Sequence, residues 1–176
     1  SGSTGKPKGV MVEHYNVVNF INHQLAAFQI SKEEKIAQFT NYCFDPSVEQ
    51  LFLALTNGAT LVIVPDAVRL DKVLFEQFVS IHEITHLHAT PSFLQTLNPR
   101  KLNSLKRVIS AGEICGIELA DRWSNACSFY NKYGPTEAAI SVTQFLYQTP
   151  LQVIGIDSVP IGRPVANTSI YILDER

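Results

Sequence analysis

Residues 59–64 have the sequence Ala-Thr-Leu-Val-Ile-Val, an unbroken run that follows Asn57-Gly58 and ends at Pro65. A short run of this kind, rich in β-branched residues and bounded by turn residues, predicts a strand that is buried on both faces. Strands of that type belong to parallel sheets that helices cover on each side. The patterns that flank this run therefore decide the fold class.

Helical and strand-like patterns alternate on both sides of the run. The predicted helices are residues 14–29, a segment from Pro46 to the Asn57-Gly58 turn, a segment with apolar positions Val73, Leu74, Phe78 and Ile81, and residues 116–126. The other predicted strands are residues 36–39, 84–88, 108–109 and 129–130. Strands that alternate with helices of crossover length indicate an α/β fold, with a mainly parallel sheet covered by helices on both faces.

The pattern changes near residue 140, after which no helix is predicted. Residues 140–147 and 169–173 have strand-like sequences, joined by turns that contain Pro and Gly. We expect them to begin a further layer, so that residues 1–140 form the α/β region and residues 141–176 start a β-rich one. Because the chain opens in a loop and closes in an apparent strand, we interpret residues 1–176 as part of one larger domain.

Composition excludes several classes of protein. The 176 residues are 45% hydrophobic, which argues against disorder. The 14 Lys+Arg nearly balance the 16 Asp+Glu and form no basic block, so nothing predicts a nucleic-acid partner. Apolar runs are too short to span a bilayer, and the three cysteines imply no disulfide framework. We expect no membrane partner and a cytoplasmic location.

The first segment with the composition of a binding site is Ser1 to Gly9, which holds three glycines, three hydroxyls and two lysines. Glycines let backbone N–H groups approach phosphate oxygens, hydroxyls donate further hydrogen bonds, and lysine supplies positive charge. The segment is not a Walker loop, because Pro7 follows the Gly-Lys pair where that motif needs Ser or Thr. A solvated surface turn is the alternative.

The second segment is Phe44-Asp45-Pro46-Ser47, at the start of a predicted helix. Asp45 has two interpretations. It is either the N-terminal cap of that helix or the partner of a substrate cation in a pocket that the helix lines.

The third segment, Asn131 to Glu137, follows directly after a predicted strand. In open α/β sheets, ligands lie beyond the carboxyl ends of the strands. The aromatic ring, amide, hydroxyl and carboxylate of this turn have the chemistry to stack a base, bind its edge and hold Mg²⁺. A Gly-Pro turn with incidental polar neighbours is the alternative.

A fourth motif, His82-Glu83-Ile84-Thr85-His86, matches the H-E-x-x-H zinc signature, but we reject that interpretation. Zinc binding needs both histidines on one face of a helix. The alternation through His88 favours a strand, in which residues four apart are separated by about 13 Å. We expect His82 to be a surface residue at the end of a helix.

In this order, the three binding segments resemble those of the adenylation domains of nonribosomal peptide synthetases. These domains belong to the adenylate-forming superfamily, with acyl-CoA ligases and luciferases. The opening SGSTGKPKGV is similar to the family's phosphate loop, with Ser3 where Thr is usual. Residues 44–47 are similar to its substrate-anchoring motif, residues 131–137 are a near-complete match to its nucleotide motif, and residues 159–164 (VPIGRP) fit its order. The resemblance covers essentially the whole chain.

The resemblance implies two half-reactions. An amino-acid carboxylate attacks the α-phosphorus of ATP, which gives aminoacyl-AMP and pyrophosphate, with Mg²⁺ as the metal cofactor. The acyl group then passes to the phosphopantetheine thiol of a peptidyl carrier protein domain, next to a condensation domain. Two anions must be brought together, so catalysis is expected to depend on positioning and charge neutralisation.

The resemblance also implies roles for single residues. Thr136 would contact phosphate and Glu137 would bind Mg²⁺, and these two are the expected catalytic residues. The nucleotide would be held by Ser3, Thr4, Gly5, Lys6, Gly112, Glu113, Asn131, Tyr133, Gly134 and Thr136, with Tyr133 stacked on adenine and Asn131 bound to its amino edge. Asp45 would pair with the α-ammonium of the substrate. The expected substrate pocket is Asp45, Pro46, Glu49, His88, Ile109, Ala111, Lys132, Ile140 and Ser141.

Two alternatives remain for the substrate and for the function. A buried Glu49 favours a polar or basic substrate side chain. Lys132 weakens that inference, because it either neutralises Glu49 internally or faces an acidic substrate itself, and the alternative for Lys132 is a side chain that extends to the rim. The chain also has the motifs of an acyl-CoA or aryl-acid ligase, although Asp45 argues against that, and a non-catalytic nucleotide-binding fragment is a further possibility. The family's downstream ribose-binding Asp, hinge and catalytic lysine do not occur in this sequence, so we expect little turnover from the chain alone.

Overall fold

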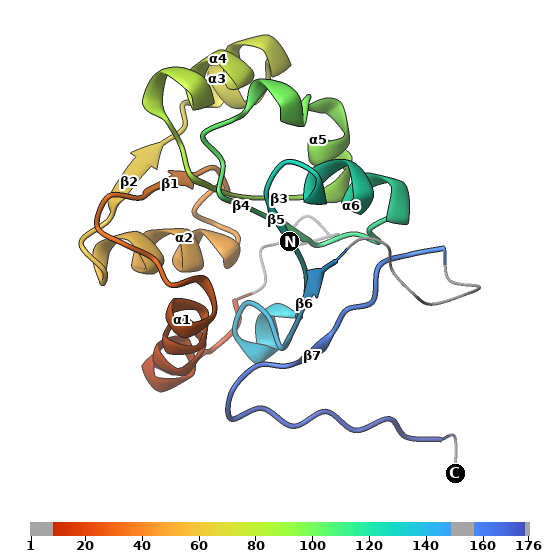
Figure 1. Cartoon of the computed structure of the whole chain (residues 1–176). Coiled ribbons are helices and arrows are strands. Elements are labelled where there is room, and N and C mark those ends of the chain that lie inside the picture. Colours follow the sequence, from red (N-terminus) through yellow and green to blue (C-terminus); the bar gives the residue numbers. More distant parts are fainter. Residues whose placement is uncertain (1–8, 149–156, 175–176) are drawn as a thin grey trace.

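The computed structural model describes residues 9–148 and 157–174 and is an α/β sheet protein (Figure 1). The sheet has the strand order β2-β1-β3-β4-β5-β6-β7. Its strands are β1 (Lys35–Gln38), β2 (Thr60–Ile63), β3 (His86–Ala89), β4 (Arg107–Ala111), β5 (Ser128–Tyr133), β6 (Thr143–Tyr147) and β7 (Arg163–Pro164). The first five are parallel, whereas β6 and β7 are antiparallel to their neighbours.

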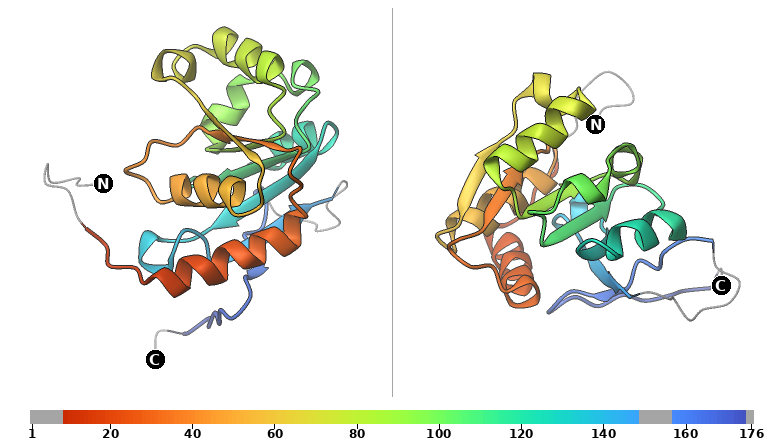
Figure 2. Two further views of the ribbon diagram at one scale, coloured as in Figure 1. Left: turned by 90° about the vertical axis from the view of Figure 1, so that its left-hand side faces the viewer. Right: turned by 45° about the horizontal axis from the view of Figure 1, so that its top comes forward.

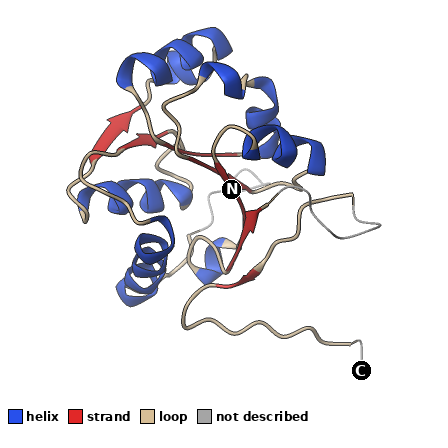
Figure 3. Cartoon of the chain, viewed as in Figure 1, coloured by secondary structure: helices blue, strands red, loops and turns tan. Residues whose placement is uncertain are grey.

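Helices cover both faces of this sheet, as the sequence predicted (Figures 1 and 3). They are α1 (His14–Phe28), α2 (Pro46–Leu55), α3 (Asp66–Arg69), α4 (Lys72–His82), α5 (Pro91–Thr96) and α6 (Ile117–Ser124), with 3-10 turns η1 (Pro99–Lys101) and η2 (Thr136–Ala138). In the left view of Figure 2, α4 lies at the top and α1 at the bottom, with the strands between them.

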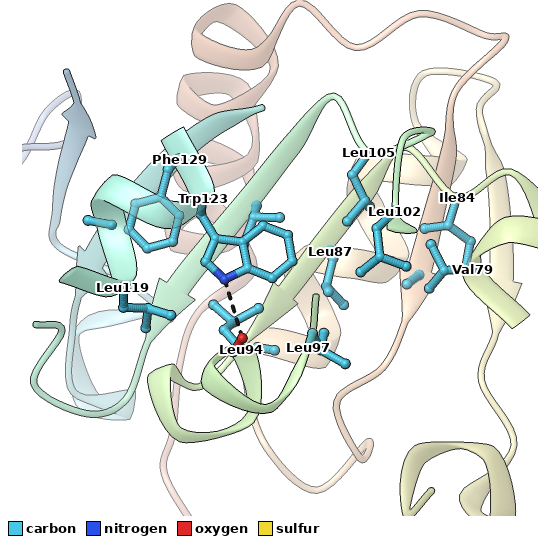
Figure 4. Close-up of a cluster of buried hydrophobic side chains, with 14 of the residues drawn as sticks. Val79, Ile84, Leu87, Leu94, Leu97, Leu102, Leu105, Leu119, Trp123 and Phe129 are labelled. Carbon is cyan, nitrogen blue, oxygen red and sulfur yellow. Dashed lines mark hydrogen bonds between the residues drawn. The ribbon is translucent and has the colours of Figure 1, made fainter. Parts of the chain in front are cut away.

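Two separate hydrophobic clusters correspond to the two faces. Under α4, α5 and α6, the indole of Trp123 is fully buried and its Nε1 donates a hydrogen bond to the carbonyl of Leu94, 3.3 Å away (Figure 4). Under α1 and α2, Phe20 and Leu53 pack with Ile109 of β4. Val108, the neighbour of Ile109, belongs to the first cluster, because successive strand residues point to opposite faces.

One prediction about a buried strand was wrong, and one helix buries a face that its spacing did not reveal. The run at 59–64 does not form a strand buried on both faces, because β2 is at the edge of the sheet in the described chain and Ile63 is 70% exposed. In α4, Phe75 and Val79 are buried, whereas Val73 and Ile81 are exposed. This helix is apolar around most of its circumference, so its spacing alone does not select the buried face.

The segments after residue 140 also differ from the expectation. β6 and β7 extend the same sheet instead of beginning a further layer, since β6 pairs with the free edge of β5. Residues 169–173 form no strand and run as an extended segment. The neighbouring residues dock on α1, where Asn19 donates to the carbonyl of Ala166 (2.8 Å) and accepts from Asn167 (2.7 Å).

The strand order reverses at β1, which has β2 on one side and β3 on the other. The connection that leaves β1 runs through α2 on one face, and the connection that leaves β3 runs through α5 on the other. Diverging connections open a crevice between the carboxyl ends of these two strands, where open α/β sheets bind their ligands. None of the helices in the described ranges combines the length and apolar character needed to cross a membrane.

Candidate functional site

A cavity of about 440 Å³ lies at this crevice, beyond the carboxyl ends of β1, β3 and β4. It is the place that the strand order predicts for a ligand. Its lining is Phe39, Thr40, Asn41, Phe44, Asp45, Pro46, Arg69, His88, Ala89, Thr90, Ala111, Gly112, Gly134, Ile140 and Ser141.

Asp45 lies at the N-terminus of α2 but makes no capping hydrogen bond within the described chain. Its Oδ2 atom is buried and has no hydrogen-bond partner among the described residues. Burial raises the pKa of Asp45, although the Thr136 hydroxyl and the Ile140 backbone amide oppose the shift. A carboxylate on a cavity wall that makes no capping bond, and whose Oδ2 has no partner among the described residues, fits a ligand cation better than it fits a helix cap.

Glu49, one turn further along α2, belongs to a buried ion cluster. Lys132 Nζ donates to Glu49 Oε1, and His88 Nδ1 lies 3.1 Å from Glu49 Oε2. Burial alone raises the pKa of Glu49, but the charges of Lys132 and His88 outweigh burial and hold it well below its ordinary value. Burial lowers the pKa of Lys132, and Glu49 partly restores it. Glu49 is therefore neutralised internally, which was one of the alternatives.

The expected substrate-pocket residues divide into two groups. Asp45, Pro46, His88, Ala111, Ile140 and Ser141 line the cavity. Glu49, Ile109 and Lys132 are fully buried behind it, under α1 and α2. Lys132 does not extend to a solvated rim, because the rings of Phe20 and Phe28 pack over its ammonium at 5.2 and 4.8 Å.

The nucleotide motif forms the end of β5 and the turn after it. Tyr133, at the end of β5, is 51% exposed. The backbone at Gly134 is close to that of Ser141, so a Cβ at Gly134 would lie 2.4 Å from Ser141 Cα. Asn131 donates through Nδ2 to the carbonyls of Val159 and Pro160, and its buried Oδ1 has no partner among the described residues. A free amide oxygen suits a donor such as an amino group.

Gly112 lines the cavity with a left-handed φ of +87° at the end of β4. Glu113, which follows it, accepts hydrogen bonds from the backbone N and the hydroxyl of Ser92, at 3.0 and 2.8 Å. Its carboxylate therefore holds the start of α5 against β4. Glu113 itself does not line the cavity.

The residues expected to hold phosphate are only partly described. Ser3, Thr4, Gly5 and Lys6 lie outside the described residues. Thr136 and Glu137 are exposed on η2. Within residues 9–148 and 157–174 no group of three or more His, Cys, Asp and Glu side chains could hold a metal ion. A single carboxylate is compatible with Mg²⁺, which often takes its other ligands from substrate phosphates and water.

The rejection of the zinc motif is confirmed for the described chain. His82 is exposed in the last turn of α4, and Glu83 ends that helix with a left-handed φ of 51°. His86 is on β3 with its ring fully buried, edge-on to Phe28 at 5.5 Å. Burial lowers the pKa of His86 well below its ordinary value, so it is a neutral core residue.

Sequence reasoning missed part of the cavity wall. Thr40 and Asn41 follow β1, and Thr90 follows β3, so their place after predicted strands was a usable signal. No sequence pattern indicated that Arg69 would line the cavity. It reaches the cavity from α3, where it pairs with Asp66 at 2.7 Å and donates to the carbonyl of Phe39.

Comparison with known proteins gives consistent results. The family model described as AMP-binding enzyme matches residues 1–176. Tyrocidine synthase 1 of Brevibacillus parabrevis is 37% identical over 175 residues, and bacitracin synthase 3 of Bacillus licheniformis is 36% identical over 175. Each alignment covers 99% of this chain, but only 16% and 3% of those proteins. The chain thus spans a small part of the relatives that it matches.

Solved structures of similar sequence have the same fold. The Vibrio cholerae adenylation domain AlmE, in complex with glycyl-adenosine-5'-phosphate, is 34% identical with a TM-score of 0.81, over 93% of this chain and 32% of that one. The nonribosomal peptide synthetase FmoA3 in its AMPPNP-bound form is 26% identical with a TM-score of 0.87, over 98% of this chain and 19% of that one.

Proposed function

Because the chain belongs to the family of AMP-binding enzymes, we propose that it is the central part of an adenylation domain that activates an α-amino acid with ATP. The observation that carries the proposal is Asp45, which lines the cavity at the strand ends and whose buried Oδ2 has no hydrogen-bond partner among the described residues. An α-ammonium group is the cation that this carboxylate would hold, and fatty-acyl or aryl acids have none.

The reaction joins the substrate carboxylate to the α-phosphorus of ATP and releases pyrophosphate. With its ammonium on Asp45, the substrate would have its carboxylate close to the nucleotide motif, because Gly134 of that motif lines the same cavity as Asp45. Tyr133 offers a ring face for adenine, and Asn131 Oδ1 an acceptor for its amino group. Glu137 would hold Mg²⁺, which neutralises phosphate charge. The contribution of these residues is to position two anions for reaction.

The similarity to large synthetases suggests which protein domains work beside this chain. Tyrocidine synthase 1 and bacitracin synthase 3 are much longer than this chain. We propose that the chain works within such a synthetase in the cytoplasm, beside a condensation domain. It would pass its aminoacyl group to the phosphopantetheine thiol of a peptidyl carrier domain. Ser3, Thr4, Gly5 and Lys6 are proposed to hold the β- and γ-phosphates.

The test is amino-acid-dependent ATP–pyrophosphate exchange over a full amino-acid panel, with this chain placed within a complete adenylation domain. We expect exchange with one or a few amino acids, and its loss in Asp45→Ala, which retains ATP binding. Activation of acids without an α-amino group, with Asp45→Ala unaffected, would contradict the proposal. The 176-residue chain alone is expected to give no exchange above background.

A further inference from the structure

The loop between β5 and β6 contains a turn with an unusual backbone, formed by residues 139–141, which we call the left-handed turn. Ala139 and Ile140 both have a positive φ, of 64° and 74°. The backbone N of Ser141 donates to the carbonyl of Ala139 at 3.0 Å, which closes a γ-turn centred on Ile140. A γ-turn of this hand is strained, and a positive φ is a genuine outlier for a β-branched residue.

The surrounding protein fixes the conformation of this turn. Ala139 and Ile140 are buried. The backbone of Gly134 lies against them, since a Cβ at Gly134 would be 2.7 Å from the carbonyl oxygen of Ile140. Directly after the turn, the backbone N of Val142 donates to the carbonyl of Tyr133 at 2.8 Å and closes the loop onto the end of β5. A strained backbone persists only where its surroundings determine it in this way.

The two strained residues are not glycines. Strain of this kind destabilises the folded state. Glycine adopts a positive φ without steric cost, but the chain has alanine and isoleucine at positions 139 and 140. Backbone outliers cluster at ligand-binding sites, where they hold a group in a fixed direction. The group that the left-handed turn directs is identified by its neighbours in the cavity.

The left-handed turn lies on the wall of the cavity that Asp45 also lines, to which it contributes Ile140 and Ser141. Burial raises the pKa of Asp45, and hydrogen bonds from the Thr136 hydroxyl and the Ile140 backbone N–H oppose that shift. Both donors belong to the loop between β5 and β6. Oδ2 of Asp45 still has no partner among the described residues. The loop therefore holds the carboxylate and leaves one of its oxygens available to a ligand.

The backbone of Ala139 and Ile140 determines where the Ile140 N–H points. A peptide unit is planar, so the direction of this N–H follows from the ψ of Ala139, which is 78°, and the φ of Ile140. Ordinary helical or extended angles at these two residues would rotate the peptide plane and direct the N–H elsewhere. The strain in the turn is thus connected to the contact with Asp45.

From these observations, and resting on the proposed function, we propose that the left-handed turn positions Asp45 for the substrate ammonium. The turn holds the Ile140 N–H on the carboxylate, and this contact fixes the orientation of the carboxylate with Oδ2 free to receive the ammonium. Ala139 is then a positioning residue that acts through Ile140 and Asp45. It lines a neighbouring cavity of about 350 Å³, and not the cavity that Asp45 lines.

The test compares variants of Ala139 in ATP–pyrophosphate exchange, with the chain in its complete adenylation domain. Ala139→Val places a β-branched residue where φ is positive, so it favours a rotated peptide plane and a displaced N–H. We expect the KM for the amino acid to rise roughly tenfold, while the KM for ATP stays within about twofold of the parent's. A general loss of stability would not separate the two KM values in this way.

Two further variants at the same position are the matched controls. Ala139→Gly retains a positive φ without strain. Ala139→Asn adds a side chain at least as bulky as valine, but asparagine adopts a positive φ more readily than other residues with a side chain. The neighbouring cavity leaves room for that side chain. We expect both variants to keep the parent's KM for the amino acid and for ATP.

A second measurement depends neither on turnover nor on a variant of Ala139. In the domain labelled with ¹⁵N-isoleucine, the amide resonance of Ile140 is identified by its loss in Ile140→Val. We expect this resonance to move in Asp45→Ala by more than any other isoleucine amide, because the N–H loses its carboxylate acceptor. The same measurement decides the matter if Ala139→Val does not fold.

The outcomes separate this inference from the proposed function. An Ile140 amide that does not move in Asp45→Ala would overturn the contact and leave amino-acid activation standing. The same is true of an unchanged KM for the amino acid in Ala139→Val, or of equal losses in the valine and asparagine variants. A folded, ATP-binding parent that is silent with every amino acid would overturn the proposed function, and the inference with it.

Discussion

At the scale of single residues, Asp45 has opposite consequences for stability and for binding. Its pKa is raised in the folded protein, so the folded state favours the protonated form. A group of this kind stabilises the fold at a pH below its unfolded pKa, and this contribution is lost as pH rises through the folded pKa. At neutral pH the charged carboxylate therefore opposes folding.

We expect Asp45→Asn to raise the melting temperature at pH 7 and to abolish amino-acid-dependent exchange. The stability gain should shrink as pH falls through the raised folded pKa of Asp45 and be smallest below about 4, the ordinary pKa range of Asp, because the parent is then protonated too. Thermal unfolding followed from pH 3 to pH 8 measures both effects. A variant that is less stable than the parent at pH 7 would show that Asp45 acts as a structural cap.

The pair formed by Lys132 and Glu49 is a second residue-scale feature that can be measured. Lys132→Met leaves the fully buried Glu49 without its ammonium partner, and we expect a loss of about 3–5 kcal/mol in the free energy of unfolding. Urea denaturation gives this number directly. The double variant Glu49→Gln with Lys132→Met removes both charges and should recover much of the loss. Equal losses in the single and double variants would mean that the charges are not coupled.

At the scale of elements, the contact between β6 and β7 depends on Gly162. This residue has a φ of +90°, and a Cβ there would lie 2.1 Å from the carbonyl oxygen of Gln144. We expect Gly162→Ala to lower the free energy of unfolding by about 3 kcal/mol, through backbone strain and overlap. Gly9→Ala is the matched control, because a Cβ at Gly9 meets nothing within 4 Å. If the two variants are equally stable in chemical denaturation, the close approach at Gly162 is not required.

The elements also show what the sequence could predict. The helices at α1 and α2 and the alternation of strands with helices follow from local periodicity and turn residues, and the prediction was confirmed. Whether β2 is central or at an edge depends on its neighbours in the sheet, which its own four residues do not encode. The same holds for the C-terminal residues 169–173, whose sequence favours a strand but which pair with no strand in the described chain.

The candidate site also has a part that the sequence predicts and a part that it does not. The place of Asp45 and of the nucleotide motif beyond strand ends follows from the sequence, because parallel strands bring their carboxyl ends to one edge. The ion pair between Lys132 and Glu49, which neutralises Glu49 behind the cavity, joins residues 83 positions apart. Its existence depends on α2 packing over β5, and sequence reasoning could give it only as an alternative. Arg69 was missed for the same reason.

At the scale of the whole molecule, the segment around Ala166 joins the two ends of the described chain. Asn19 makes two hydrogen bonds to it, and the backbone N of Ala166 donates to His23 Nδ1 at 3.2 Å. We expect Asn19→Ala to cost about 1 kcal/mol and to speed amide hydrogen exchange at residues 165–168, with β3 and β4 unaffected. Asn16→Ala, one turn earlier on α1, is the control. Unchanged exchange at 165–168 would show that other contacts hold this segment.

This junction has a consequence for the order in which the protein acquires its structure during synthesis. The ribosome makes α1 before the sheet, whereas its partner Ala166 follows 147 residues later. The outward face of α1 that receives this segment remains bare while the sheet forms, and closing so large a loop has a substantial entropic cost. We therefore expect docking of this late segment onto the early helix to be a late step of folding, and we expect a nascent chain stalled before residue 166 to expose a surface for chaperones to bind.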